Sequence, residues 1–314
     1  MIRYVLRRLA MMLLVLVGVA FVVFSIMELT PGDPAVMMLG DNATAEEMAA
    51  FREANGLNNP FFVRFFDYLY NLVTKFDFGT SWLSDRPILG TLLERVPVTL
   101  IIAFSSIAFA SLIGVFIGVF SAVKQYSPLD YFARITAMIC AAVPVFWLGM
   151  MLAILFALKL HWLPASGIGS WKHYVLPMLT LGIPYSARIL RSTRSYMLEA
   201  VRQDYIRTAR AMGVPERKII WKHAFQNIAL PVINTIGVYV GSLLGGAVVT
   251  ETVFGCNGLG SFITNAVKRK DIPAVTGGTI FLAAIFSLIL LSVDLIHAAI
   301  DPRIKARYAR GKKK

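Results

Sequence analysis

The stretch LAMMLLVLVGVAFVVFSIM, which runs from Leu9 to Met27, contains no charged side chain. As a helix rising about 1.5 Å per residue it would be about 28 Å long, which matches the roughly 30 Å hydrocarbon core of a bilayer. Arg3, Arg7 and Arg8 precede it, as in a secretory signal, but the stretch is long for a signal core and no small-residue cleavage pattern follows Met27. We therefore expect a retained membrane span.

Five further apolar blocks follow the first. The 314-residue chain is 57% hydrophobic and 16% charged, which is more apolar surface than one soluble core can bury. This composition predicts an all-α polytopic membrane protein with six transmembrane helices. The further spans are expected at Thr99 to Val123, Ile135 to Leu158, Tyr174 to Ala187, Leu230 to Thr250 and Ala274 to Ala298. The fourth of the six is the shortest, and Pro177 and Pro184 interrupt it.

Basic residues are unevenly divided between the two sets of loops. With the N-terminus inside, the four cytoplasmic segments hold 3, 2, 9 and 7 of the 31 Lys and Arg, or 21 in all, while the external segments hold 12 of the 18 acids. Positive charge concentrates in the cytoplasmic loops of membrane proteins. Both termini are therefore expected in the cytoplasm, and topology and anionic lipid, rather than nucleic acid, explain the net charge of +13.

The expected organisation follows from these spans. It comprises a cytoplasmic N-terminus (1–8), the first span (9–27), an external helical insertion (28–97), a core with the other five spans and a cytoplasmic loop at 188–231 (98–304), and a basic cytoplasmic tail (305–314). In the insertion, Thr44 and Glu47 form a capping box that predicts a helix ending near Asn55 and Gly56. The aromatic-rich residues 59–76 predict a second helix at the membrane interface. Five bases and ten acids make the insertion net negative.

The loop between the fourth and fifth spans, Arg188 to Pro231, reads DYIRTARAMGVP from position 204 to 215. Apolar residues recur on one face at Ile206, Ala209 and Met212, and Gly213 can end the helix in a left-handed conformation. The pattern predicts two short helices that meet at an elbow, which could fill a groove on a partner protein, with Ala209 and Ala211 allowing close approach. The alternative is an amphipathic segment on anionic lipid.

This loop resembles the coupling loop of the permease subunits of binding-protein-dependent ABC importers. Arg207, Thr208 and Ala209 occupy the places of the general Glu-Ala-Ala motif, a variant similar to the peptide and nickel branch of that family. Further motifs in the family's order extend the resemblance from Met1 to about Ile304: Thr30 to Pro34, Asp77 to Ser81, Trp162 to Gly167, Gly245 to Phe254, Asn257 to Gly260, Lys270 to Pro273 and Asp301 to Ile304. Cys256 and Asn257 depart from the family's usual residues.

The resemblance implies the first (B-type) transmembrane subunit of an importer with type I permease architecture, in the cytoplasmic (inner) membrane of a prokaryote. Its solutes would be dipeptides or oligopeptides, moved by alternating access. Its partners would be a homologous second permease, two ATPase subunits or domains, an external solute-binding protein and membrane lipid. The residues that would contact the ATPase are Asp204, Arg207, Thr208, Ala209, Arg210, Ala211 and Gly213.

Two alternatives remain open. Relatives in the same branch carry nickel chelates or glutathione, so either could be the solute. A stand-alone secondary transporter belongs to a different class, but such proteins carry intramembrane charges near mid-span, and here the spans are almost uncharged.

The chain is expected to have no enzymatic activity of its own. It lacks the Gly-x-x-x-x-Gly-Lys-Ser/Thr motif that cradles ATP phosphates, so ATP and Mg would bind to the partner subunits, and no cofactor is expected here. His161 and His173 share one external loop, but two ligands without a third favour packing over a metal site.

Three acidic or aromatic side chains near the span ends remain as candidates. Glu251 and Phe254 could form the mouth of the solute pathway, although Glu251 could equally lie at the water boundary. Asp294 in the sixth span could be functional or could hydrogen bond near the helix end, beside His297.

Overall fold

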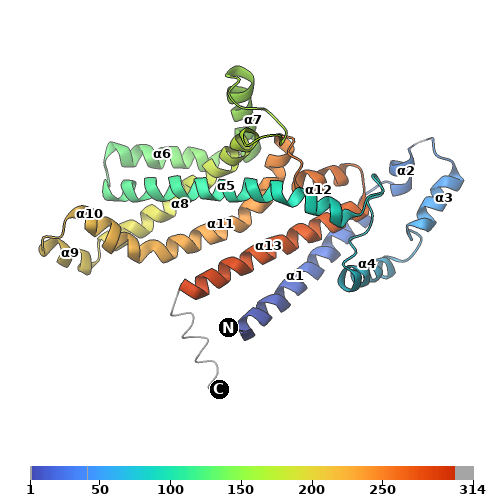
Figure 1. Cartoon of the computed structure of the whole chain (residues 1–314), viewed down its shortest axis with the longest axis horizontal. Coiled ribbons are helices and arrows are strands. Elements are labelled where there is room, and N and C mark those ends of the chain that lie inside the picture. The colour runs from blue at the N-terminus through green and yellow to red at the C-terminus, as the bar shows by residue number, and fades with distance from the viewer. Residues whose placement is uncertain (1, 41, 301–314) are drawn as a thin grey trace. The chain divides into compact units, whose positions relative to one another are not determined.

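The computed structural model describes residues 2–40 and 42–300, and the regular structure within them is helical (Figure 1). The helices are α1 (Ile2–Leu29), α2 (Pro34–Leu39), α3 (Ala45–Ala54), α4 (Phe61–Lys75), α5 (Ile88–Val123), α6 (Pro128–Ala142), α7 (Val145–Leu152), α8 (Lys172–Val201), α9 (Asp204–Ala211), α10 (Glu216–Lys218), α11 (Phe225–Val253), α12 (Leu259–Lys268) and α13 (Ile272–Ile300). Two π-helical segments continue α7 and α10, namely η1 (Ala153–Lys159) and η2 (Ile219–Ala224). The predicted tail at 305–314 lies outside the described residues.

The chain forms two compact units. Among the described residues, the first unit combines those up to Val98 with Asn257–Leu288, and the second combines Thr99–Cys256 with residues 289–300. Helices α5 and α13 each contribute residues to both units.

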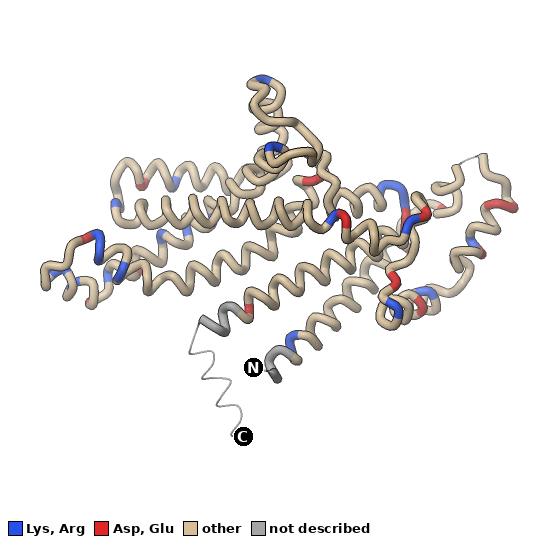
Figure 2. The backbone as a smooth tube through the Cα atoms, in the orientation of Figure 1, with Lys and Arg blue, Asp and Glu red and all other residues tan. Residues whose placement is uncertain are grey.

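Four of the described helices are long and apolar enough to cross a membrane. They are α1, α5, α13 and the helix that runs from Glu216 to Val253, which begins well before the expected span at Leu230. The charged residues gather mainly near helix ends and connecting segments, whereas the long middle stretches of α5 and α11 are uncharged (Figure 2). This agrees with the expected sequence of apolar spans for these segments.

The expected third span is not one straight helix. Helices α6 and α7, with η1, pass the same test of length and composition only as a pair, and they are bent by 103° at the break between them. Pro144 has no N–H to donate and its ring forces the preceding Val143 into an extended conformation, with φ −70° and ψ 129°. The apolar residues from Ile135 to Leu158 predicted one continuous span and gave no sign of the break before Pro144.

The expected fourth span is helical, but its composition is not apolar enough for it to count among the membrane-crossing helices. Helix α8 is 30 residues long and packs against α6, α7 and α11. It is close to α5 as well: a Cβ added at Gly114 would lie 2.7 Å from the carbonyl oxygen of Ser186, and one at Gly118 would lie 2.9 Å from that of Leu190. Small residues allow helices to approach this closely in membranes. Because neighbouring helices enclose α8, its side chains need not match lipid.

In the first unit, the two helices predicted within residues 28–97 are present. Thr44 and Glu47 form the capping box at the start of α3, and Gly56 has φ +62° just after the helix ends. The aromatic segment is α4, and its Phe65 is buried against Phe21 and Phe24 of α1. Packing on α1 therefore stabilises this helix, in addition to any contact with a membrane interface.

Candidate functional site

The predicted elbow is formed by α9 and the turn after it. Gly213 has φ +74°. The Val214 N–H donates to the Ala209 carbonyl at 3.1 Å and the Gly213 N–H donates to the Arg210 carbonyl at 3.0 Å, which together make a Schellman motif. An added Cβ at Gly213 would meet nothing within 4 Å, so the backbone conformation, rather than space, requires glycine there.

The two faces of α9 are chemically different. Ile206 and Ala209 are buried, while the other predicted ATPase-contacting residues are exposed: Asp204, Arg207, Thr208, Arg210, Ala211 and Gly213. The expectation that Met212 shares the apolar face is wrong, because its side chain is 71% exposed. Ala209 packs into the hydrophobic core of this chain and so holds α9 in place, and the exposed face of α9 carries the polar side chains.

Arg210 links α9 to the next helix. Its Nε donates to Glu216 Oε1 at 2.6 Å, across the turn that contains Gly213. Both side chains are largely exposed, so the pair orients the elbow more than it stabilises it. From Glu216 the helix continues without a break through η2 into α11.

A hydrophobic core lies beneath α9. It contains residues from the ends of four other helical segments: Val119 and Ala122 of α5, Met197 and Ala200 of α8, Ile219 and Ala224 of η2, and Ile228 and Val232 of α11. Burying a large aliphatic side chain contributes about 1.5–3 kcal/mol. Displacing α9 would therefore strain its packing on α5, α8 and α11 together.

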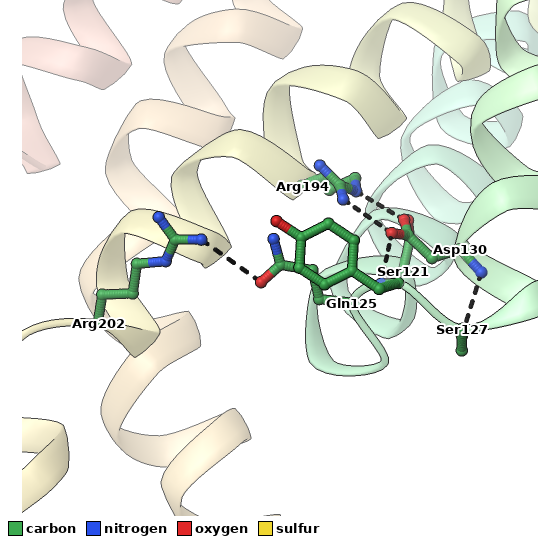
Figure 3. Close-up of polar contacts among 7 residues, drawn as sticks. Ser121, Gln125, Ser127, Asp130, Arg194 and Arg202 are labelled. Atoms are coloured by element: carbon green, nitrogen blue, oxygen red, sulfur yellow. Dashed lines mark hydrogen bonds and ion pairs between the residues drawn. The ribbon is translucent and has the colours of Figure 1, made fainter.

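A buried ion pair joins α6 to α8 near this core (Figure 3). Asp130 accepts hydrogen bonds from Arg194 Nε and Nη2, both at 2.8 Å, and from Ser121 Oγ of α5 at 2.5 Å. The Tyr126 N–H donates to the same carboxylate at 3.0 Å. Asp130 is fully buried, so these four donors satisfy a charge that would otherwise be costly.

Sequence reasoning missed this ion pair. Arg194 was counted among the bases of a cytoplasmic loop, although residues 188–201 belong to α8. The available signal was local: Ser127 caps α6 by accepting from the Asp130 N–H at 3.3 Å, and Pro128 occupies the first turn. That signal locates Asp130 at a helix start but does not identify its distant partner.

Glu251 and Phe254 lie inside the second unit. Thr99 Oγ1 donates to Glu251 Oε1 at 2.6 Å, and both Glu251 and Phe254 are buried. The Phe254 carbonyl accepts from the Gly167 N–H at 3.2 Å, so two of the motifs noted in the sequence meet here. Burial raises the pKa of the nearby Cys256 thiol to about 11, with a smaller contribution from Glu251. Both cysteines of the chain are free.

Three other motifs meet in the first unit, around the start of α13. The Lys270 ammonium donates to the carbonyls of Thr30, Pro31 and Gly32. The neighbouring Asp271 is buried and accepts from Ser81 Oγ at 2.6 Å and from the Trp82 N–H at 3.2 Å. These contacts give the Thr-Pro-Gly, Gly-Thr-Ser and Lys-Asp-Ile-Pro motifs a common structural role.

The histidine pair shows no metal geometry in the part of the chain that the structure describes. His173 Nδ1 lies 3.0 Å from the Ser170 N, and His161 is exposed. Among these residues, no group of three or more His, Cys, Asp or Glu could hold a metal ion. Asp294 of α13 is half-buried, but the side chain of His297 lies outside the described residues, so the expected contact between them stays a prediction.

Comparisons with known proteins cover nearly the whole chain. Residues 114–306 match the family described as binding-protein-dependent transport system inner membrane component, and residues 1–103 match its N-terminal family. The dipeptide transport system permease protein DppB of Alkalihalophilus pseudofirmus is 38% identical, over 97% of this chain and 100% of that protein. The glutathione transport system permease protein GsiC of Salmonella typhimurium is 39% identical, over 97% of this chain and 99% of that protein.

Solved structures show a similar fold. A chain of the MetNI methionine ABC transporter in an inward-facing conformation has a TM-score of 0.55 and 20% identity, covering 68% of this chain and 97% of that chain. A chain from an amino acid ABC transporter with histidines has a TM-score of 0.52 and 16% identity, covering 68% and 94%. At these identities the likeness concerns the fold alone.

Proposed function

The chain belongs to the family of binding-protein-dependent transport inner membrane components, as a permease of an ABC importer, and we propose that the solute it carries is a short peptide. Two relatives support this, since DppB is named for dipeptides and GsiC for glutathione, which is itself a tripeptide. Each aligns over almost its full length with this chain. Glutathione is the second candidate solute beside a dipeptide, because GsiC is 39% identical over 97% of this chain.

The single observation that carries the mechanism is the construction of α9. Its outer face is polar and exposed, its inner face is buried in a core shared with α5, α8 and α11, and its C-terminal turn leads directly into the helix from Glu216 to Val253. We propose that α9 and the turn after it contact the ATPase. The contacting residues would be Asp204, Arg207, Thr208, Arg210, Ala211 and Gly213. ATP and Mg would bind to the ATPases, and the shared core would pass their movement to the spans.

In this proposal the chain crosses the membrane six times. The spans are α1, α5, the bent pair α6 and α7 with η1, α8, α11 and α13, with both termini in the cytoplasm. Residues 28–97 then form the external insertion. The chain pairs with a second, homologous permease and receives solute from an external binding protein, with Glu251 and Phe254 near the pathway mouth.

Uptake by the reconstituted importer tests the solute. Proteoliposomes would contain this chain, the second permease and both ATPases, with the binding protein added outside. We expect ATP-dependent accumulation of a labelled dipeptide, and a variant with an inactive ATPase serves as the control. Accumulation of a nickel chelate, with neither the dipeptide nor glutathione accumulated, would overturn the proposed solute while leaving the permease assignment intact.

A further inference from the structure

The first unit contains a cavity of about 400 Å³ that none of the transport steps uses. It is lined by residues from the segment 55–59, α4, the turn at 79–85 and the start of α13, with Phe24 of α1. Its volume falls within the range of pockets that hold small molecules.

Hydrogen bonds within the protein hold the turn at 79–85, which forms one wall of this cavity. Asp271 holds Ser81 and Trp82 through the hydrogen bonds described above, and the Ile88 N–H donates to the Gly79 carbonyl at 3.0 Å. A Cβ added at Gly79, where φ is +86°, would lie 3.6 Å from the Pro273 side chain. The turn therefore packs closely on the start of α13, and the pocket is preorganised.

Two residues that line the cavity carry buried hydroxyls with no hydrogen-bond partner among the residues that the structure describes. The hydroxyls are the phenol of Tyr68 and Oγ1 of Thr276, and the Thr276 residue is only 1% exposed. Buried hydroxyls are nearly always paired in native proteins, so two at one cavity indicate that a ligand supplies the missing partners. Burial raises the pKa of Tyr68, which keeps it a neutral phenol that can accept as well as donate.

The charges at the cavity favour a cation. Asp67 and Asp85 line it, and neither forms an ion pair within the described residues. Arg64, the basic residue in the lining, is already occupied, because its Nη2 lies 2.5 Å from Glu28 Oε1 and its Nε donates to the Asn59 carbonyl at 3.1 Å. The balance of free charge is therefore negative.

The aromatic part of the lining suits the same kind of ligand. The rings of Phe24 and Tyr68 have centroids 6.2 Å apart, and Trp82 also borders the cavity. Aromatic faces attract ammonium and guanidinium groups and also cover apolar stems.

We propose that this cavity binds a small organic cation, an ammonium, amidinium or guanidinium group on an apolar stem. Such a group has only N–H donors, which the hydroxyls of Tyr68 and Thr276 and the carboxylates of Asp67 and Asp85 can accept. Neither Glu251 nor Phe254 lines this cavity, and cation binding there does not depend on which solute is imported.

Binding of benzamidinium to the purified full-length chain tests the proposal. Benzamide is the matched neutral probe, since it has nearly the same shape without the charge. Ligand-observed NMR titration would measure both. We expect saturable binding of benzamidinium and binding of benzamide at least about tenfold weaker, which is the effect of one hydrogen bond to a charged group.

Substitutions locate the site. Thr276→Val and Tyr68→Phe remove one unpartnered hydroxyl each with little change of shape, so each should weaken benzamidinium about tenfold without lowering the melting temperature. Asp85→Asn should have a similar effect on binding. Glu46→Gln, at an exposed acid outside the cavity, is the matched control and should change nothing.

A second pair of probes identifies the source of the cation. Gly-Arg and Gly-citrulline differ in the charge of the side chain, so binding of Gly-Arg would show that a peptide side chain can enter, and binding of benzamidinium alone would restrict the site to free cations. Both results support the cavity as a cation site. Equal binding of charged and neutral probes, or benzamidinium binding that survives all three substitutions unchanged, would overturn the proposal.

Discussion

Two single residues of the second unit, Gly213 and Asp130, are each needed for the structure around them. Gly213 is required by its positive φ at the end of α9, and Asp130, which is buried, is required to neutralise the half-buried Arg194. The first acts through the backbone and the second through charge. Both lie in or near the segment that we propose transmits ATPase movement, so each supports a separate prediction.

Replacing Gly213 with Val should impair coupling. A β-branched residue at φ +74° costs about 1–2 kcal/mol of backbone strain, which would disrupt the Schellman motif and turn the outer face of α9. Solute-stimulated ATPase activity of the assembled complex should fall. Gly213→Asn, which tolerates the left-handed region, is the matched control and should retain most of the activity. Full stimulation in the Val variant would contradict the coupling role.

Replacing Asp130 with Ala should destabilise the whole chain. The change leaves the Arg194 guanidinium, which is 16% exposed, without its carboxylate, and breaking a buried pair costs about 3–5 kcal/mol. The melting temperature in detergent measures the loss. Arg202→Ala is the control, since Arg202 reaches Gln125 only at 3.5 Å on the exposed surface. Equal melting temperatures of the two variants would show that the ion pair is not needed for stability.

At the scale of elements, α8 and α9 depend on their neighbours more than on their own composition. Helix α8 is surrounded by α6, α7 and α11, and so can include prolines and polar residues within a bundle. Helix α9 is only eight residues long, too short to be stable alone in water, and is kept helical by its cap and by the core beneath Ile206. Such an element moves with the helices it contacts.

Helix α3 supports a prediction about capture of the binding protein. Glu46 and Glu53 are exposed and contribute to the net negative charge of residues 28–97, so they would steer a basic surface of that protein. Changing both to Lys leaves the Thr44 capping box and the Arg52–Asp33 pair intact. Transport should fall, with a weaker dependence on salt, because surface charges act over a Debye length of about 8 Å at physiological salt.

Co-purification of the ATPases is the control for this double substitution and should be unchanged. Transport rates equal to those of the unchanged protein at both low and physiological salt would rule out electrostatic steering by α3.

At the scale of the whole molecule, each unit joins segments that are far apart in the sequence. In the first unit, Lys270 and Asp271 bind segments roughly 190 to 240 residues earlier. In the second, Thr99 and Glu251 are brought together in the same way. These contacts hold the ends of long helices, which is where connecting segments must be fixed if the helices are to move as rigid elements.

The six-span topology can be tested by labelling with an impermeant thiol reagent in intact cells. Single cysteines would be introduced at Asn42 and at Lys313, after Cys140 and Cys256 have been replaced. The division of basic residues predicts that only the cysteine at position 42 reacts from outside, and that the one at position 313 reacts after the membrane is opened. Reaction of both from outside would contradict the six-span topology.

Local patterns were sufficient for much of the helical structure. Uncharged runs such as Leu9 to Met27 predicted long helices because burial in lipid requires apolar side chains over a fixed length. The cap at Thr44 and the left-handed turn at Gly213 were predicted because a helix end satisfies its N–H and C=O groups with neighbours in sequence. The loop residues Arg207, Thr208 and Ala209, with the other motifs in the family's order, indicated the family of the chain.

The tertiary structure alone decided the remaining features. The Asp130–Arg194 pair and the burial of Glu251 depend on helices that are distant in the sequence, which no local pattern specifies. The low hydropathy of α8 is explained only by the helices around it, and the exposure of Met212 by where α9 meets its core. Sequence periodicity records that a face is apolar, whereas the neighbours of that face are set by how the helices pack.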